Sequence, residues 1–166
     1  MSKPKVIVSA CLFGHPVRYD GMARPFSAAQ TRKLSTLFQV IPVCPECLGG
    51  LQVPRPAAEI VGGSGADVLS AKARVRTAQG EDQTEAFVAG ARSVLECALK
   101  HQVQFAILKA NSPSCGTSQH YDGSFCGKLR PGQGVTAALL QRHGIQLISE
   151  ENLQIEQLAD ALCQTE

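Results

Sequence analysis

The chain has 166 residues, of which 44% are hydrophobic and 18% are charged, and its formal net charge is +2 at pH 7. This length supports one well-buried core and is too short for two ordinary domains, so a single domain over residues 1–166 is expected. No apolar stretch approaches the roughly 20 residues needed to cross a bilayer, which excludes a helical membrane protein. The start reads as a strand without the cleavage pattern of a secretory leader, so a cytoplasmic location is expected.

Basic residues are scattered along the chain, and the densest group is KARVR at 72–76. Phosphate backbones usually require a concentrated basic surface, so this distribution disfavours nucleic acid as a partner. A small molecule is the expected ligand, while the sequence does not indicate an oligomeric state.

Two strands separated by a helix are predicted at the start of the chain. Residues 5–9 (KVIVS) form a β-branched run that predicts a strand, and residues 27–38 carry apolar side chains at helical spacing. Residues 39–43 (QVIPV) predict the second strand. Pro42 indicates that this strand lies at an edge or is about to end.

A long segment rich in glycine and proline follows at 44–67, and its breakers predict a loop. Residues 68–77 alternate like an exposed strand or hairpin. The strongest helix pattern lies in residues 80–102, with Asp82 or Thr84 as its N-cap. Its expected buried stripe consists of Phe87, Ala91, Val94, Leu95 and Ala98.

The second half of the chain repeats this alternation. A strand is predicted at 104–110, a second long loop at 111–133, a helix at 134–144, a strand at 145–149 and a helix at 151–163. Alternating strands and helices predict parallel pairing with right-handed crossovers. The expected fold is a single-domain α/β structure, a layered Rossmann-like sheet that is mostly parallel, with helices on both faces.

The seven cysteines are odd in number, and in a reducing compartment this favours metal binding or catalysis over a disulfide framework. Open parallel sheets bind ligands beyond the carboxyl ends of their strands. Cys11, Cys44 and Cys115 each follow a predicted strand, so they are expected to converge at one edge of the sheet. Cys97 and Cys163 lie late in predicted helices and are expected far from that edge.

The two cysteine-bearing loops resemble each other. VIVSACLFGHPVRYDG and ILKANSPSCGTSQHYDG both run from an apolar strand through a cysteine to YDG, at 19–21 and 121–123. This similarity suggests two related strand–loop units that face one centre. YDG is also an ordinary turn sequence, and that interpretation fits equally well.

The segment VCPECLGG at 43–50 contains a CxxC pair whose chemistry the residues alone leave open. Glycines and prolines after the pair predict that no helix begins there, which argues against a thioredoxin-like dithiol at a helix N-terminus. A zinc site built from Cys11, Cys44, Cys47 and Cys115 is chemically sound. An iron–sulfur site held by cysteines from several loops fits equally well.

Several segments in order resemble one known family. They are VSACLFGHPVRYDG, VCPECLGGLQVPRPAAEIVGG, ILKANSPSCG, YDG and GQGVTAALL, and they extend over about residues 6–150. Together they resemble the thiouracil desulfurase-like family. The resemblance implies a 4Fe-4S cluster held by Cys11, Cys44 and Cys115, with one iron left open. It further implies an enzyme that replaces the sulfur of a thiolated nucleobase or nucleoside by oxygen and releases hydrogen sulfide without net redox change.

The same resemblance implies catalytic roles for Glu46, in the CPE segment, and for Ser112, the first serine of SPSCG. Ser114 is the alternative if the register of that loop differs. A thiocarbonyl sulfur is a soft donor suited to an open iron, which would polarise the C=S bond. Glu46 would then activate water or carry a proton.

Two further residues are expected near this site, and a pair in the first long loop has a structural interpretation. Lys109, at the end of a strand, and Thr136, at a helix start, are candidates for contacts to the substrate or to the groups around it. Arg55 and Glu59 lie close together in PRPAAE, and they are expected to pair with each other and brace the first long loop.

Cys47 separates the desulfurase from its alternatives. The family pattern does not require a cysteine at this position, so Cys47 is interpreted as a bystander. If it were a ligand, the open iron would close, and the chain would be a closed-site zinc or iron–sulfur protein without desulfurase activity. A nucleobase-binding module without chemistry is the third hypothesis.

Overall fold

A four-stranded parallel sheet forms the centre of the described chain. The structure is a computed structural model that describes residues 2–164. Within this range the central sheet has the order β2-β1-β5-β8, and all of its neighbouring strands pair in parallel. Its strands are β1 (Lys5–Ser9), β2 (Gln39–Val43), β5 (Phe105–Leu108) and β8 (Gln146–Ser149). The predicted α/β fold with a parallel sheet is confirmed.

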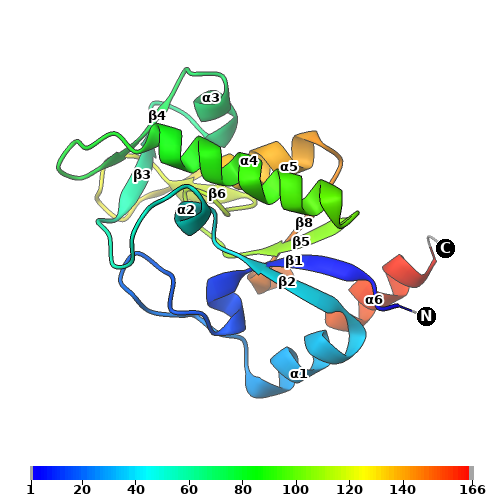
Figure 1. The fold of residues 1–166 in the computed structure, drawn as a ribbon. Helices are drawn as coiled ribbons and strands as arrows, with labels where there is room; N and C mark the ends of the chain where they lie inside the picture. Colours follow the sequence, from blue (N-terminus) through cyan, green and yellow to red (C-terminus); the bar gives the residue numbers. More distant parts are fainter. Residues whose placement is uncertain (1, 165–166) are drawn as a thin grey trace.

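Helices cover both faces of this sheet, as predicted (Figure 1). One face carries α1 (Ala28–Leu37) and α6 (Ile155–Cys163), and the other carries α4 (Thr84–Lys100) and α5 (Val135–Arg142). Among residues 2–164, no helix has both the length and the apolar character required to cross a membrane.

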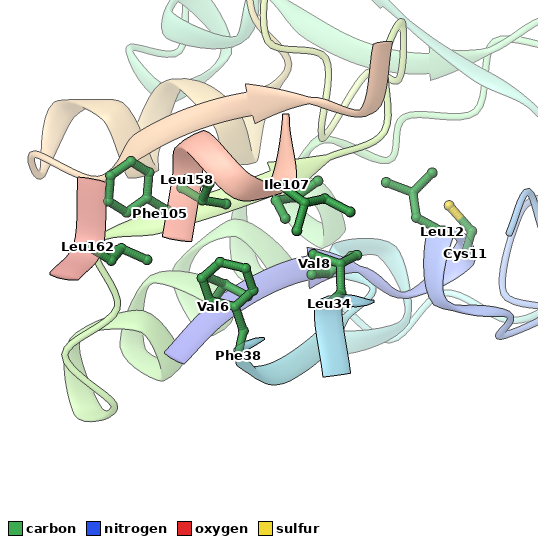
Figure 2. Packing of buried hydrophobic residues seen from close by; sticks show 11 residues of the cluster. Val6, Val8, Cys11, Leu12, Leu34, Phe38, Phe105, Ile107, Leu158 and Leu162 are labelled. Atoms are coloured by element: carbon green, nitrogen blue, oxygen red, sulfur yellow. The ribbon is translucent and has the colours of Figure 1, made fainter. Parts of the chain in front are cut away.

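The central strand β1 supplies both cores, because successive side chains of a strand point to opposite faces. Val6 and Val8 pack toward α1 and α6, whereas Ile7 packs toward α4 and α5. Figure 2 shows the first core, whose buried members include Leu34, Phe38, Phe105, Ile107, Leu158 and Leu162. Burial on both faces explains why β1 reads as an unbroken apolar run.

The two predicted long loops contain short elements that the sequence patterns do not reveal. The first contains α2 (Pro45–Leu48), β3 (Ala58–Val61) and α3 (Gly65–Leu69), and β3 pairs antiparallel with β4 (Arg74–Thr77). The second contains an antiparallel pair, β6 (Gln119–Tyr121) and β7 (Leu129–Pro131). The expectation of unstructured loops was therefore wrong. Elements of three to five residues are too short to show a periodic pattern.

Helix α3 and the antiparallel pair β3–β4 pack over α4 and α5 rather than over the central sheet. A third core joins Ile60 of β3 and Val75 of β4 to Phe87 of α4 and Val135 of α5. The predicted stripe of α4 is confirmed in Phe87, Ala91, Val94 and Ala98, while Leu95 is partly buried. The β3–β4 sheet therefore packs on α4, the helix that also covers the central sheet.

Asp82 holds the start of α4 by side-chain bonds, although the N-cap residue is Gln83. One carboxylate oxygen of Asp82 accepts from the Thr84 amide at 2.9 Å, and the other accepts from the Arg74 guanidinium at 2.7 Å. The bond from Arg74 holds the pKa of Asp82 well below its usual range. Asp82 thus ties α4 to strand β4.

Replacing Asp82 with asparagine keeps an acceptor for the Thr84 amide but removes the exposed ion pair with Arg74, so the free energy of unfolding is expected to fall by about 0.5 kcal/mol at neutral pH. The folded-state pKa of Asp82 is depressed, so its contribution is present above the ordinary value of 3.8 and is lost as the pH falls toward the folded value. Urea denaturation at pH 7 and at pH 3 should therefore show a smaller difference between wild type and variant at pH 3. Asp160→Asn, at an exposed position of α6, is the control. A difference that stays constant between the two pH values would contradict this role.

Candidate active site

The carboxyl ends of three parallel strands bring three cysteines to one cavity. Cys11 lies in the 3-10 turn η1 (Ala10–Phe13) directly after β1, Cys44 directly follows β2, and Cys115 lies in the segment after β5. All three line a cavity of about 420 Å³. In Figure 1 these strand ends lie on the left side of the molecule. The cysteines thus converge at one edge of the sheet, as predicted from the topology.

The three thiols lie in surroundings that disfavour a bare negative charge. Cys11 and Cys115 are buried, and Cys44 is half-buried. Burial raises the pKa of Cys11 and of Cys44. Burial also raises the pKa of Cys115 to about 12, and the negative charge of Glu46 contributes to this shift. Figure 2 shows the Cys11 sulfur beside Leu12 at one end of the apolar core. Such thiols stay neutral unless a cation replaces their protons.

A short helix begins at the CxxC pair, so the prediction that no helix starts there was wrong. Cys44 is the N-cap of α2, and Pro45 occupies the first helical turn, where its fixed φ is favourable. Glu46 follows in the same turn, and the helix ends at Gly49. Cys47 lies in α2 but does not line the cavity. The short helix therefore presents Cys44 and Glu46 to the cavity together.

The Glu46 carboxylate joins three segments of the chain. One of its oxygens accepts a hydrogen bond from the Ser114 hydroxyl. The other lies 3.5 Å from the Arg55 guanidinium and 3.4 Å from the Cys44 sulfur. Both side chains of the ion pair are largely buried, so solvent screens this pair less than a surface pair. Glu46 is therefore held in one orientation beside a cysteine.

The expected pair between Arg55 and Glu59 does not form, which corrects that prediction. Arg55 contacts Glu46 instead, and its guanidinium also donates to the Val17 carbonyl at 3.0 Å. One oxygen of Glu59 accepts from the Gly123 amide at 3.0 Å and from the Phe125 amide at 3.2 Å. Arg55 lies in the loop before β3 and Glu59 lies in the strand itself, so the path of the loop and not the spacing in PRPAAE sets their partners.

The two serines of SPSCG form a hydroxyl chain that ends at Glu46. The Ser112 hydroxyl accepts from the amides of Ser114 and Cys115, each at 3.1 Å, and lies 3.0 Å from the Ser114 hydroxyl. Because the single Ser114 proton points to Glu46, Ser112 must donate in the bond between the two hydroxyls. Both serines line the cavity, and Ser114 is fully buried.

Lys109 and Thr136 differ in their relation to the cavity. Lys109 lines it, and its ammonium group lies 2.8 Å from the Glu150 carboxylate, whose other oxygen accepts from the Ala110 amide. Thr136 is fully buried and does not line the cavity, so the expectation of a direct substrate contact there was wrong, while a place among the groups around the site stays a prediction. The start of α5 instead holds the SPSCG loop, since the amide of Val135 donates to the Pro113 carbonyl.

Sequence reasoning missed several residues that line the cavity. Arg55 was noticed for the wrong partner, and Gln83 and Asn111 gave no signal. Tyr19 and Tyr121 also line the cavity, and the repeated YDG segment was the signal that could have found them. Cys97 and Cys163 do not line it, in agreement with their predicted positions.

Comparisons with known proteins identify the family of the chain. The 2-thiouracil desulfurase family matches residues 6–152. An uncharacterized protein of Bacillus subtilis (strain 168), YbbK, is 45% identical over 148 residues, which are 89% of this chain and 97% of that protein. A solved structure described as the 4Fe-4S-dependent thiouracil desulfidase TudS is 42% identical, with a TM-score of 0.84, over 98% of this chain and 99% of that chain. The chain belongs to the 2-thiouracil desulfurase family.

Proposed function

We propose that the chain is a 4Fe-4S-dependent desulfidase that removes sulfur from a thiolated nucleobase or nucleoside of the thiouracil type. The observation that carries the proposal is the cavity itself, where Cys11, Cys44 and Cys115 lie together with Glu46. Family membership supports it, and so does the likeness to a structure described as a 4Fe-4S-dependent thiouracil desulfidase.

The three cysteines that line the cavity have the chemistry that an iron–sulfur cluster needs. Thiolates are its usual protein ligands, and the positive charge of iron offsets the burial that keeps these thiols protonated. Among residues 2–164, no three His, Cys, Asp or Glu side chains converge as the ligands of a single ion. A cluster of four irons does not require such convergence, because each thiolate binds a different iron. This arrangement is compatible with a cluster, and family membership favours a cluster over the four-cysteine zinc alternative.

The Cys47 thiol contacts the Cys44 thiol but does not line the cavity, so we assign the cluster to three thiolates and leave Cys47 out. Three ligands at four irons leave one iron without a protein ligand. Held by these three thiolates, such a cluster would supply a soft Lewis acid suited to polarising the C=S bond of the substrate.

The proposed reaction is a hydrolysis, and its atoms balance without an electron carrier. The oxygen of water bonds to the carbon that carried sulfur, and the C–S bond breaks with its electron pair left on sulfur. The two protons of water leave with that sulfur as hydrogen sulfide, and the base keeps a carbonyl oxygen. The chain must therefore remove a proton from water and deliver protons to sulfur.

Glu46, Ser112 and Ser114 lie where they can carry out these proton transfers. We assign the first step to the Glu46 carboxylate, which would take a proton from water. The hydroxyl chain connects Ser112 through Ser114 to the same carboxylate. Once Glu46 is protonated, both hydroxyls can reverse, so that Glu46 donates to Ser114, Ser114 donates to Ser112, and the Ser112 proton passes to the leaving sulfur. Arg55 orients the carboxylate, and Lys109, held by Glu150, fixes the end of β5 beside the cavity.

Anaerobic reconstitution with iron and sulfide tests the proposal. Iron is then counted per chain, and sulfide release is measured from 2-thiouracil and from 4-thiouridine. We expect about four irons per chain and sulfide release in wild type and in Cys47→Ser, and loss of both in Cys115→Ser. Metal content that depends on Cys47, or zinc in place of iron, would favour the closed-site alternative and overturn the proposal. A nucleobase-binding module would bind uracil and release no sulfide.

A further inference from the structure

The two tyrosines of the chain lie at the cavity and remain partly exposed there. The chain has two tyrosines and no tryptophan. Both tyrosines line the cavity, and Tyr19 remains 43% exposed and Tyr121 38% exposed. Large aromatic side chains normally contribute much of the buried apolar area of a core. Neither tyrosine serves the core here.

The backbone of each tyrosine is fixed while its ring stays open. The Tyr19 carbonyl accepts from the Arg55 amide at 2.8 Å, and one face of its ring meets the Arg18 guanidinium at 5.7 Å. Tyr121 lies in β6, and its carbonyl accepts from the His120 ring at 2.7 Å. Within residues 2–164, neither tyrosine hydroxyl makes a hydrogen bond. The two rings are therefore held at the cavity without a partner that uses their polar ends.

A turn function explains the rest of both YDG segments but leaves the tyrosines unexplained. Asp20 and Asp122 each accept the backbone amide two residues further on. Gly21 and Gly123 have φ values of 75° and 91°, which favour glycine. The aspartate and the glycine are sufficient to make each turn, so the tyrosine is not needed for it.

We propose that Tyr19 and Tyr121 form a stacking rim for the flat ring of a heteroaromatic thione. Each strand–loop unit contributes one cysteine and one tyrosine to the same cavity, Cys11 with Tyr19 and Cys115 with Tyr121. A planar ring that carries sulfur at one edge fits a cavity with both cysteines and tyrosines. Its sulfur would face the cysteines, and its faces would lie against the tyrosine rings. The inference rests on the proposed function and adds two positioning residues to it, whose rings would favour a flat ring over a saturated ring with the same polar edge.

The size of the expected effect follows from stacking on aromatic side chains. Removal of one such ring typically weakens base binding by about 5-fold to 140-fold. Tyr19→Leu and Tyr121→Leu should therefore each raise the dissociation constant for uracil, the proposed product, and the KM for 2-thiouracil by at least about 5-fold. Phenylalanine at either position should restore wild-type binding, because the ring is kept. Iron content and kcat should remain within about twofold, since the rim only positions the ring.

Fluorine NMR of the cluster-loaded full-length protein, labelled with fluorotyrosine, provides a direct readout. The chain contains two tyrosines, so two resonances are expected, and the two phenylalanine variants assign them. Both resonances should shift on titration with uracil, and wild type should bind uracil more tightly than 5,6-dihydrouracil, which has the same polar edge but a puckered ring. Leu99→Ala, at an exposed position of α4 outside the cavity, is the control.

The outcomes separate this inference from the proposed function. Leucine variants that bind uracil as tightly as wild type, or tyrosine resonances that do not respond to uracil, would overturn the rim even if sulfide is released normally. If uracil shifts both resonances and the leucine variants bind it weakly, the rim is supported even where wild type releases no sulfide. Loss of the preference for uracil over dihydrouracil in the leucine variants would identify stacking as the cause.

Discussion

Replacing Glu46 with glutamine is expected to reduce sulfide release by at least about 100-fold in kcat while iron per chain stays at the wild-type level. Glutamine keeps the length of the side chain and an oxygen that accepts from the Ser114 hydroxyl, but it cannot take a proton from water. Positioned proton transfer typically contributes 10²-fold to 10⁴-fold to a rate. The loss should appear in the rate and not in cluster content, because Glu46 is not among the proposed ligands.

Glu59 offers a matched control within the same cavity. It is also a carboxylate that lines the cavity, but one of its oxygens already accepts two backbone amides. Glu59→Gln keeps an acceptor for those amides, so its turnover should remain within a few-fold of wild type. Initial rates of sulfide release from 2-thiouracil and iron content per chain measure both variants. A Glu46→Gln protein that retains its rate would remove Glu46 from the mechanism, and equal losses in both variants would point to a general effect of charge.

The central sheet was predictable because each of its strands carries its own signal. β1 is buried on both faces and reads as a β-branched run, and a helical pattern separates it from β2. Parallel pairing then follows from the alternation, since a crossover helix must return the chain to the same edge. The same rule brings Cys11, Cys44 and Cys115 together, because the carboxyl ends of parallel strands share one side of the sheet.

The details of the site were less predictable because they depend on contacts between distant segments. The four residues of α2 are too few to show a helical period. Pro45 and Gly49 read as breakers in the sequence, although Pro45 begins the helix and Gly49 is its C-cap. The partner of Arg55 is set by the path of the loop and not by sequence separation. Thr136 lies at a helix start as predicted, but the SPSCG loop covers that end, which keeps the residue away from the cavity.

Gly90 of α4 lets the backbone of α2 approach α4 closely, and this contact positions the residues that α2 contributes to the cavity. A Cβ atom at Gly90 would overlap the carbonyl oxygen of Pro45, and a Cβ atom at Gly49 would overlap the carbonyl oxygen of Ala86. The backbones of α2 and α4 therefore pack directly on each other, and α2 lies beneath α4 in Figure 1. Since Pro45 lies between Cys44 and Glu46, this contact sets how deeply both side chains reach the cavity.

Replacing Gly90 with alanine is expected to lower the free energy of unfolding and to disable the site. Helix propensity alone predicts the opposite, because alanine stabilises a helix interior by about 1 kcal/mol relative to glycine. Overpacking typically costs about 1–3 kcal/mol, and here the clash is with backbone, which no side-chain rotation relieves. The difference between this cost and the gain in helix propensity is a net loss of up to about 2 kcal/mol. A displacement of α2 by about 1 Å would lower turnover about 10²-fold.

Urea denaturation, iron content and sulfide release of Gly90→Ala measure the two effects together. Glu96→Ala, at an exposed position of the same helix, should change the free energy of unfolding by less than about 0.5 kcal/mol and leave turnover unchanged. If Gly90→Ala instead gains the stability that helix propensity predicts and loads iron normally, then α2 does not rest on the backbone of α4. If stability falls while turnover per bound iron is preserved, the contact serves the fold alone. A fall in both, with Glu96→Ala unaffected, would mean that one glycine in α4 determines the depth of Cys44 and Glu46 in the cavity.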